Sequence, residues 1–262
     1  MFEKPDIQFP RRGRGSLLRR LRAIFVLSAL VVVSACAKPS GIEDIIDPYE
    51  TVNRRTHELN RSLDEAILRP VSMVYVDIVP EPVMIGLSNL NNFLDTPAIV
   101  VNNLLQLDLK SAASNSARFA VNGTVGLLGL YDAASEIGLY QQQSDFGETL
   151  HVWGVGEGAY IELPVLGGST ERDTVGIVVD ALFNPMTLVL EDYWRLSGSG
   201  VEALNMLGDR GRFGNTVDSV LYDSADSYAQ SRLFYLQSRR YELGMRLEED
   251  DYFDPYEDIY GE

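Results

Sequence analysis

The chain has 262 residues, of which 45% are hydrophobic and 23% charged, and its formal net charge at pH 7 is −16. This composition is typical of a folded globular protein, and the acidic balance argues against a nucleic-acid binder, which would carry a basic face. One cysteine and two histidines exclude a disulfide scaffold and a multi-cysteine zinc site, and they leave little material for histidine-based chemistry.

The first 35 residues have the pattern of a signal peptide. Seven Arg and Lys residues oppose only two acidic residues in this segment, and an uncharged apolar run fills residues 23–35. Thirteen helical residues would reach roughly 20 Å, which is short of the roughly 30 Å hydrocarbon core of a bilayer. We therefore predict a signal peptide over residues 1–35 rather than a lasting transmembrane helix.

The apolar run ends in Val33-Ser34-Ala35-Cys36, which resembles the lipobox of bacterial lipoproteins. In such proteins the cysteine becomes the first residue of the mature chain. We expect Cys36 to carry S-diacylglycerol and an N-acyl chain, because stable anchoring needs more than one acyl chain; no other cofactor and no metal are expected. Ala37 follows rather than Asp, which favours the outer membrane of a Gram-negative bacterium. A buried free cysteine after an ordinary signal peptide is the alternative.

Residues 36–46 are predicted to be a short tether, and residues 47–244 a mainly helical domain. Asp47 and the Pro-Tyr-Glu that follows it are typical of a helix start, with Asp47 as the N-cap. An apolar stripe continues this helix to Ile67, and Pro70 is expected to end it.

A second, short helix is expected after Pro70, and a third from Val83 that closes before Pro97. Residues 98–109 are apolar on almost all sides, and residues 111–130 are rich in Ser, Ala and Gly, which lets helices approach closely. No run after residue 35 reaches about 18 apolar residues, so none is expected to span a bilayer in the ordinary way.

Residues 153–168 are rich in glycine and predict a loop with one short strand. Gly154, Gly156 and Gly158 do not have the spacing of a dinucleotide-binding loop, so we interpret them as tight backbone turns.

The remaining elements are predicted from helical periodicity and breakers. Helices are expected over residues 173–183 and 185–195, with a linker over 197–200. One long helical stripe then runs from residue 215 and closes at Gly244. The acidic tail, residues 245–262, is predicted to be disordered.

Catalytic patterns are mostly missing from the sequence. No G-x-S-x-G motif occurs, and His57 and His151 stand alone. Arg172 and Asp173 are predicted to form a local ion pair, with Asp173 capping the next helix. We therefore expect that the chain is not an enzyme; a lipid-modifying enzyme such as a phospholipase is a weaker alternative.

Motifs spread through residues 47–190 resemble those of the MlaA (VacJ) family of outer-membrane lipoproteins. The opening motif is Asp47-Pro48-Tyr49-Glu50-x-x-Asn53-Arg54, and the most specific one runs from Trp153-Gly154 through Leu163-Pro164 to Arg172-Asp173. There are departures, such as Leu107 where the family often has glycine. The resemblance marks these candidates for the passage and its loops: Asn53, Arg54, Asn92, Asn102, Asn122, Gly154, Gly156, Gly158, Pro164, Arg172 and Asp173.

The resemblance implies a ring-like helical single domain with one Gly-rich loop segment, embedded in one leaflet of the outer membrane. Such proteins surround an amphipathic passage, through which phospholipids strayed into the outer leaflet reach a periplasmic lipid-binding shuttle. The shuttle delivers them to an ABC complex in the inner membrane, and the family associates with trimeric porins. A structural envelope lipoprotein that associates with porins without transport is the alternative. Asn102 and Asn122 either hydrogen-bond in the core or offer polar groups in the passage.

Overall fold

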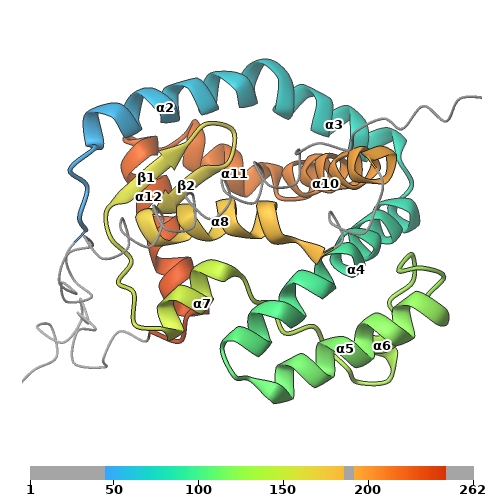
Figure 1. The fold of residues 1–262 in the computed structure, drawn as a ribbon. Coiled ribbons are helices and arrows are strands. Elements are labelled where there is room, and N and C mark those ends of the chain that lie inside the picture. Colours follow the sequence, from blue (N-terminus) through green and yellow to red (C-terminus); the bar gives the residue numbers. More distant parts are fainter. Residues whose placement is uncertain (1–44, 186–191, 246–262) are drawn as a thin grey trace, which may run out of the picture. The chain divides into compact units, whose positions relative to one another are not determined.

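The computed structural model describes residues 45–185 and 192–245 (Figure 1). This part of the chain is mainly helical and contains one small two-stranded sheet, which confirms the predicted fold class. The signal peptide, Cys36 and the acidic tail lie outside the described residues, and the ring-like arrangement and the embedding in one leaflet stay predictions.

The first helix continues through the proline that was expected to end it. α2 (Glu50–Leu63), a π-helical turn η1 (Asp64–Leu68) and α3 (Arg69–Ile78) follow one another without a break. The amide of Arg69 donates to the carbonyl of Asp64, five residues back. This wider turn accommodates Pro70 in the first turn of α3, where a missing N–H is tolerated, so the predicted helix end is wrong.

Asp47 does not cap this helix, which begins at Glu50. Its carboxylate instead accepts hydrogen bonds from the side chains of Asn53, Tyr228 and Arg232. The long-range partners therefore replace the predicted local capping bond.

α4 (Glu81–Leu105) also continues through a proline, Pro97, so the prediction that a helix closes before this residue is wrong. Pro97 has no N–H to donate to the carbonyl of Phe93, four residues back. The hydroxyl of the neighbouring Thr96 donates to the carbonyl of Asn92 at 2.7 Å. Packing of α4 against α5 and α10 offsets the cost of the proline, about 3 kcal/mol.

In the described part of the chain, no helix alone has the length and apolarity to cross a membrane. The helix from Glu50 to Ile78 and α4, bent by 118° relative to one another, meet that criterion only as a pair.

Three shorter helices follow: α5 (Leu109–Thr124), α6 (Ala133–Glu136) and α7 (Phe146–Val152). Each starts after an aspartate whose side chain accepts a backbone amide hydrogen bond, namely Asp108, Asp132 and Asp145. These N-caps satisfy amides that have no partner inside the helix.

The Gly-rich segment contains two strands where one was predicted. β1 (Tyr160–Leu163) and β2 (Gly167–Thr170) pair antiparallel, with Tyr160 opposite Thr170. The second strand was missed because its Gly-Gly-Ser-Thr sequence has low strand propensity. A small apolar core forms where Tyr160 meets Tyr228 and Leu236.

α8 (Glu171–Phe183) covers the helix predicted over residues 173–183. Its N-cap is Thr170, whose hydroxyl oxygen accepts from the amide of Asp173 at 3.2 Å. The prediction that Asp173 is the cap is therefore wrong, whereas the predicted ion pair with Arg172 is confirmed, with Nε 3.1 Å from Oδ1.

α10 (Asp192–Arg212) runs through residues 197–200, which were predicted to be a linker. The Ser and Gly residues of this stretch have weak helix propensity, but they belong to a long helix that packs against α3 and α4. The predicted helix over residues 185–195 lies partly outside the described residues.

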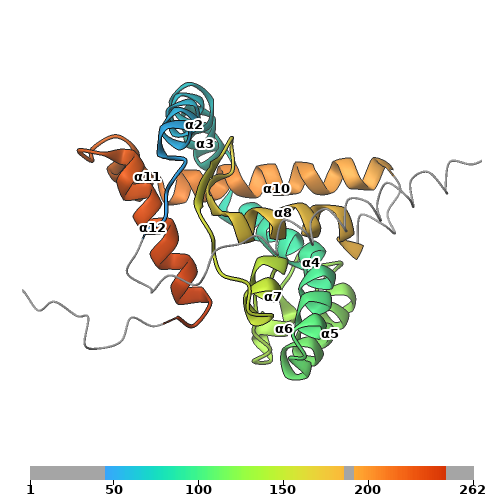
Figure 2. The ribbon, with the colours of Figure 1, turned by 60° about the vertical axis from the view of Figure 1, so that its left-hand side comes forward.

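The long stripe predicted from residue 215 is broken into α11 (Gly214–Leu221) and α12 (Ser227–Glu242). The break forms because Asp226 caps α12 through the amide of Ala229. Gly244, with a φ of 72°, follows the end of α12 as predicted. Figure 2 shows α12 beside the strands and the α4–α5 pair away from them.

Candidate functional site

Large apolar side chains are exposed on most elements of the described fold. Two groups of them are together called the apolar surface below. On the helix from Glu50 to Ile78 and on α4, they are Val52, Leu59, Ile67, Val71, Met73, Val74, Ile78, Val83, Ile85, Val101, Leu104 and Leu105. Around the two ends of α5, they are Leu107, Leu109, Val125, Leu127, Leu128, Leu130 and Tyr131. Large exposed apolar areas are typical of surfaces that meet a protein, a ligand or a lipid.

The buried positions of the described fold are unusually polar. Among the described residues, sixteen buried side chains are polar or charged and eleven are apolar. Because a buried polar group costs free energy unless it is hydrogen-bonded, these side chains must have partners. Polar networks therefore fasten the elements to one another, and they contain most of the residues that the family resemblance marks.

Asn53 fastens α2 to β1. Its side-chain amide donates to the carbonyl of Tyr160 at 3.0 Å and to Asp47 at 2.9 Å, and its oxygen accepts from the amide of Glu162 at 3.0 Å. All hydrogen-bonding positions of this buried amide but one are thereby used. Asn53 holds the strand in place and does not face an open space.

Arg54, the next residue, connects α2 to the start of α12. Its guanidinium donates to both carboxylate oxygens of Asp226, at 3.0 and 2.8 Å, and to Glu50 at 2.8 Å, and it lies over the ring of Tyr228 at 4.6 Å. The hydrogen bond from Arg54 lowers the pKa of Asp226 to about 2. The carboxylate therefore stays ionised at any physiological pH.

A second buried group lies beside Asn53. His57 Nδ1 is 3.3 Å from Glu162 Oε1, and its Nε2 is 3.0 Å from the hydroxyl of Ser227. Tyr160 donates to the other oxygen of Glu162, and Asn60 donates to Oε1. The line Ser227–His57–Glu162 has the order of a serine-hydrolase triad. Yet His57 is buried, and the ring of Tyr228 packs against it edge to face.

Asn102 joins three helices. Its side-chain nitrogen donates to Asp180 on α8 at 3.0 Å, and its oxygen accepts from the hydroxyl of Thr149 on α7 at 3.1 Å. Burial raises the pKa of Asp180. Asn92, on the same helix, is half-buried, and its backbone carbonyl accepts from Thr96. The structure thus gives Asn102 a hydrogen-bonding role in the core.

Asn122 fastens the end of α5 to the start of α6. Its side chain donates to Asp132 at 2.9 Å and accepts from the amide of Ala134 at 2.9 Å. Nη2 of the buried Arg118 lies 3.0 Å from both oxygens of Asp132. Burial opposes ionisation of Asp132, but hydrogen bonds from Ser135, Asn122 and Arg118 hold its pKa below the ordinary value.

Arg172 and Asp173 lie in the most highly charged of these networks. Asp173 contacts Arg172 at 3.1 Å and Arg239 of α12 at 3.2 Å, and it accepts from the hydroxyl of Tyr235 at 2.9 Å. Burial opposes ionisation of Asp173, but the charges of Arg239 and Arg172 outweigh it and hold its pKa below the ordinary value. The network fastens α8 to α12.

The glycines of the segment between α7 and β1 have different surroundings. Gly154 has a φ of 87° and open space around it, whereas a Cβ on Gly158, with a φ of 72°, would lie 2.5 Å from Glu171 Oε2. Gly156 is half-buried between them, and Pro164 is exposed in the turn between the strands. Gly158 therefore needs to be glycine on two counts, whereas Gly154 needs it for its backbone angle alone.

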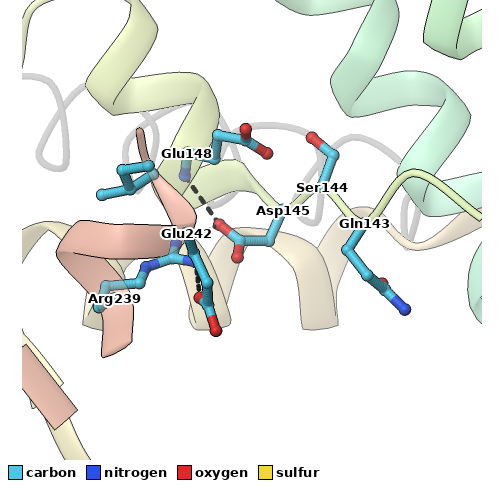
Figure 3. Close-up of a pocket in the computed structure, with 7 residues that line it drawn as sticks. Gln143, Ser144, Asp145, Glu148, Arg239 and Glu242 are labelled. Atoms are coloured by element: carbon cyan, nitrogen blue, oxygen red, sulfur yellow. Dashed lines mark hydrogen bonds and ion pairs between the residues drawn. The ribbon is translucent and has the colours of Figure 1, made fainter. Parts of the chain in front are cut away.

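A pocket of about 430 Å³ opens where α7 begins and α12 ends, and Figure 3 shows its polar lining. Arg239 points into it and donates to Asp145 at 2.7 Å and to Glu242 at 3.3 Å. The remaining lining residues are Gln143, Ser144, Glu148 and Leu243. Carboxylates and amides of this kind do not suit an acyl chain.

The structure distributes the marked residues over separate networks and does not gather them into one site, so a role in lining a passage stays a prediction. Several of their partners, including Asp132, Glu162 and Tyr228, were not predicted from the sequence. Only Asp132 carried a local signal, because aspartate directly before a helix is typical of an N-cap. Glu162 and Tyr228 meet residues more than 100 positions away, which no local pattern indicates.

The chain is similar to known proteins over most of the described residues. The family model described as MlaA lipoprotein matches residues 45–242. The intermembrane phospholipid transport system lipoprotein MlaA of Shigella flexneri is 33% identical over 227 residues, which are 83% of this chain and 86% of that protein. The protein of the same name from Escherichia coli K12 is 32% identical with the same coverage.

A solved structure is also similar. It is described as the structural basis for maintenance of bacterial outer membrane lipid asymmetry, and it matches with a TM-score of 0.66 and 33% identity. The match covers 75% of this chain and 98% of that one.

Proposed function

Because the chain belongs to the MlaA lipoprotein family, we propose that it removes mislocalised phospholipids from the outer leaflet of the outer membrane. It passes them through an amphipathic passage to a periplasmic shuttle for retrograde transport, and it thereby maintains lipid asymmetry. Its relatives from Shigella flexneri and Escherichia coli are named as lipoproteins of an intermembrane phospholipid transport system, which supports this role.

The physical need for such a protein is large. Exposing the roughly thirty methylenes of a two-chain lipid to water costs on the order of 24 kcal/mol, at about 0.8 kcal/mol each. A protein lowers this barrier when it offers apolar side chains to the tails and polar groups to the headgroup.

The observation that carries the proposal is the exposed apolar surface on a domain with polar networks inside. In an acidic protein surrounded by the aqueous periplasm, this many exposed Leu, Ile and Val side chains would be unfavourably hydrated. Embedding in one leaflet covers them, and the bent pair formed by the helix from Glu50 to Ile78 and α4 suits shallow insertion. The ring of helices around a passage belongs to this proposal.

The partners that we propose are phospholipid, a trimeric porin, the periplasmic lipid-binding shuttle and, through the shuttle, the ABC complex. The lipid on Cys36 holds the protein in the outer membrane. No bond of the lipid is broken or formed, so the protein acts as a conduit and not as an enzyme.

The test is the amount of phospholipid in the outer leaflet of the intact organism. Deletion should raise it, and complementation with the wild-type protein should restore it. Cys36→Ala protein, present at the same level, should lose membrane anchoring and fail to restore it. If outer-leaflet phospholipid stays constant while porin level or assembly changes, the proposal is overturned in favour of a structural porin partner.

A further inference from the structure

The loop of residues 125–131 connects α5 to α6 (Figure 1). It exposes apolar side chains from an unusual backbone. We call it the apolar tip. The side chains of Leu127 and Leu128 are each 69% exposed, and their φ angles are 54° and 59°. L-residues with a Cβ avoid this left-handed region, which glycine enters without cost. Because both leucines are largely exposed, packing within the protein does not offset the strain.

The backbone of the apolar tip is held in a fixed shape. The amide of Gly126 donates to the carbonyl of Val121 at 3.1 Å, and the amide of Gly129 donates to that of Asn122 at 2.9 Å. The loop then closes on itself, since the amide of Tyr131 donates to the carbonyl of Gly126 at 2.9 Å. The strained angles are therefore imposed by hydrogen bonds at both ends of the loop.

The apolar tip is also clamped against α4. A Cβ added to Gly129 would lie 2.3 Å from the Cβ of Phe93, so only glycine lets the loop approach so closely. The side chain of Asn89 donates to the carbonyl of Leu130 at 3.3 Å. Below the loop, Asn122 and Asp132 form the buried network described above. The hydrogen-bonded network of Asn122 and Asp132 thus holds a loop whose apolar side chains point outward.

We propose that the apolar tip is a rigid wedge that inserts into the hydrocarbon of the leaflet, with Leu127 and Leu128 deepest. This inference rests on the proposed function, which places the domain at a membrane. Insertion into lipid explains why leucines occupy strained positions at which glycine would fit better. Exposure of the same side chains to water does not explain it.

Two further observations favour lipid as the occupant. The eight residues between Cys36 and Ile45 allow a reach of roughly 30 Å at about 3.5 Å per residue, so a lipidated Cys36 keeps the domain close to the bilayer. The apolar tip has no charged residue, and it ends in the half-exposed Tyr131, a residue type enriched at the membrane interface. An uncharged loop avoids the cost of burying charge in hydrocarbon.

The position of the wedge is tested in the full-length lipidated protein, reconstituted into phosphatidylethanolamine–phosphatidylglycerol vesicles. Leu128→Cys is labelled with an environment-sensitive fluorophore, and lipids with a nitroxide on the acyl chain serve as quenchers. In the lipidated protein the sulfur of Cys36 is blocked, so the introduced thiol is the one that reacts. Val165→Cys is the matched control, because Val165 is also exposed and has a φ of 69°.

We expect a blue-shifted emission and several-fold stronger quenching at residue 128 than at residue 165. Equal quenching at the two positions overturns the wedge. If that occurs while wild-type protein clears outer-leaflet phospholipid, the transport function stands without the wedge. If the label at 128 is quenched while wild-type protein clears no lipid, the wedge stands and the transport function fails.

A second variant separates insertion from folding. Leu127→Gly with Leu128→Gly removes the apolar side chains and relieves the backbone strain, so the melting temperature should stay the same or rise. Because the wedge is lost, vesicle-bound protein labelled at Val125→Cys should be quenched several-fold less in this background. Val165→Gly, which relieves the same strain elsewhere, should leave that quenching unchanged. Undiminished quenching in the double-glycine protein would overturn the role of the two leucines.

Discussion

At the residue scale, the hydrogen-bonded line Ser227–His57–Glu162 has two possible roles, a catalytic triad or a structural connection. It has the order of nucleophile, base and acid, with distances of 3.0 and 3.3 Å. Asn60 and Tyr160 also donate to Glu162, and burial of His57 leaves its ring little room to accept a substrate proton. We therefore interpret the line as a clamp between α2, β1 and α12.

This interpretation predicts a small effect for Ser227→Ala. The variant should lose about 1 kcal/mol of unfolding free energy, the usual net value of one hydrogen bond, and retain full lipid clearance. His57→Ala, the matched control, should lose roughly 3 kcal/mol because it opens a cavity in the core. Thermal unfolding and outer-leaflet phospholipid are the two measurements. A stable Ser227→Ala protein that clears no lipid, together with fatty acid release by the wild type, would show a hydrolase instead.

Asp173 gives a prediction for the dependence of stability on pH. Its pKa in the folded protein lies below the ordinary value, because Arg239 and Arg172 outweigh the effect of burial. The carboxylate therefore contributes stability above the unfolded pKa of about 3.9, and this contribution disappears as the pH falls through the folded pKa. The unfolding free energy should decrease steeply below about pH 4.

Asp173→Asn provides the check. It leaves Arg239 and Arg172 with one partner fewer, so it should cost about 3–5 kcal/mol at neutral pH. The variant should also show a shallower decrease in acid, since the titrating group has been removed. Urea unfolding between pH 7 and pH 3 measures both effects. An acid decrease as steep as that of the wild type would assign the effect to other carboxylates.

At the scale of elements, apolar periodicity correctly predicts that the chain is helical, because burying one face of a helix requires that period. It fails where long-range contacts override local breakers. Pro70 fits inside a helix through the π-turn at Asp64–Leu68, and residues 197–200 belong to α10, which packs as a whole against α3 and α4. Conversely, the stripe from residue 215 breaks where Asp226 turns to cap α12 and to bind Arg54.

The candidate residues show the same division. The family resemblance could mark Asn53, Asn102 and Asp173, because their motifs are local in sequence. Their partners could not be predicted, since Tyr160 lies 107 positions from Asn53 and Arg239 lies 66 positions from Asp173. The exposure of Leu127 and Leu128 could not be predicted either, because an apolar residue next to glycine is also compatible with a buried turn.

The segment between α7 and β1 gives a prediction at this scale. Gly154→Ala should cost roughly 1–2 kcal/mol, because it places a Cβ in a left-handed backbone with open space around it. Gly158→Ala should cost more, since the new Cβ also displaces Glu171, which accepts from the amide of Ala159. Urea unfolding of the two variants measures the difference. Equal losses would mean that Glu171 moves aside freely and does not hold the segment.

At the scale of the whole molecule, two properties oppose each other. The formal net charge of −16 favours solubility through repulsion between molecules, and the predicted removal of the basic residues 1–35 would make the mature chain more acidic still. The apolar surface favours association, because water gains entropy when such side chains are covered. The proposed embedding in a leaflet makes the two properties compatible, since lipid would cover the apolar surface while the acidic remainder faces water.

Without the proposed lipid anchor, the opposition between charge repulsion and apolar attraction can be measured in solution. The Cys36→Ala protein, freed from the membrane, should self-associate in detergent-free buffer and become monodisperse when a non-ionic detergent covers its apolar surface. Added salt should increase the association, because it screens the repulsion between acidic molecules and leaves apolar attraction intact. Light scattering coupled to size exclusion measures the mass in each condition. The same measurement on Cys36→Ala protein that also carries Leu127→Gly and Leu128→Gly should show weaker association. A monomer in detergent-free buffer at every salt concentration would mean that the exposed leucines, isoleucines and valines need no cover, and the case for embedding in a leaflet would lose its physical basis.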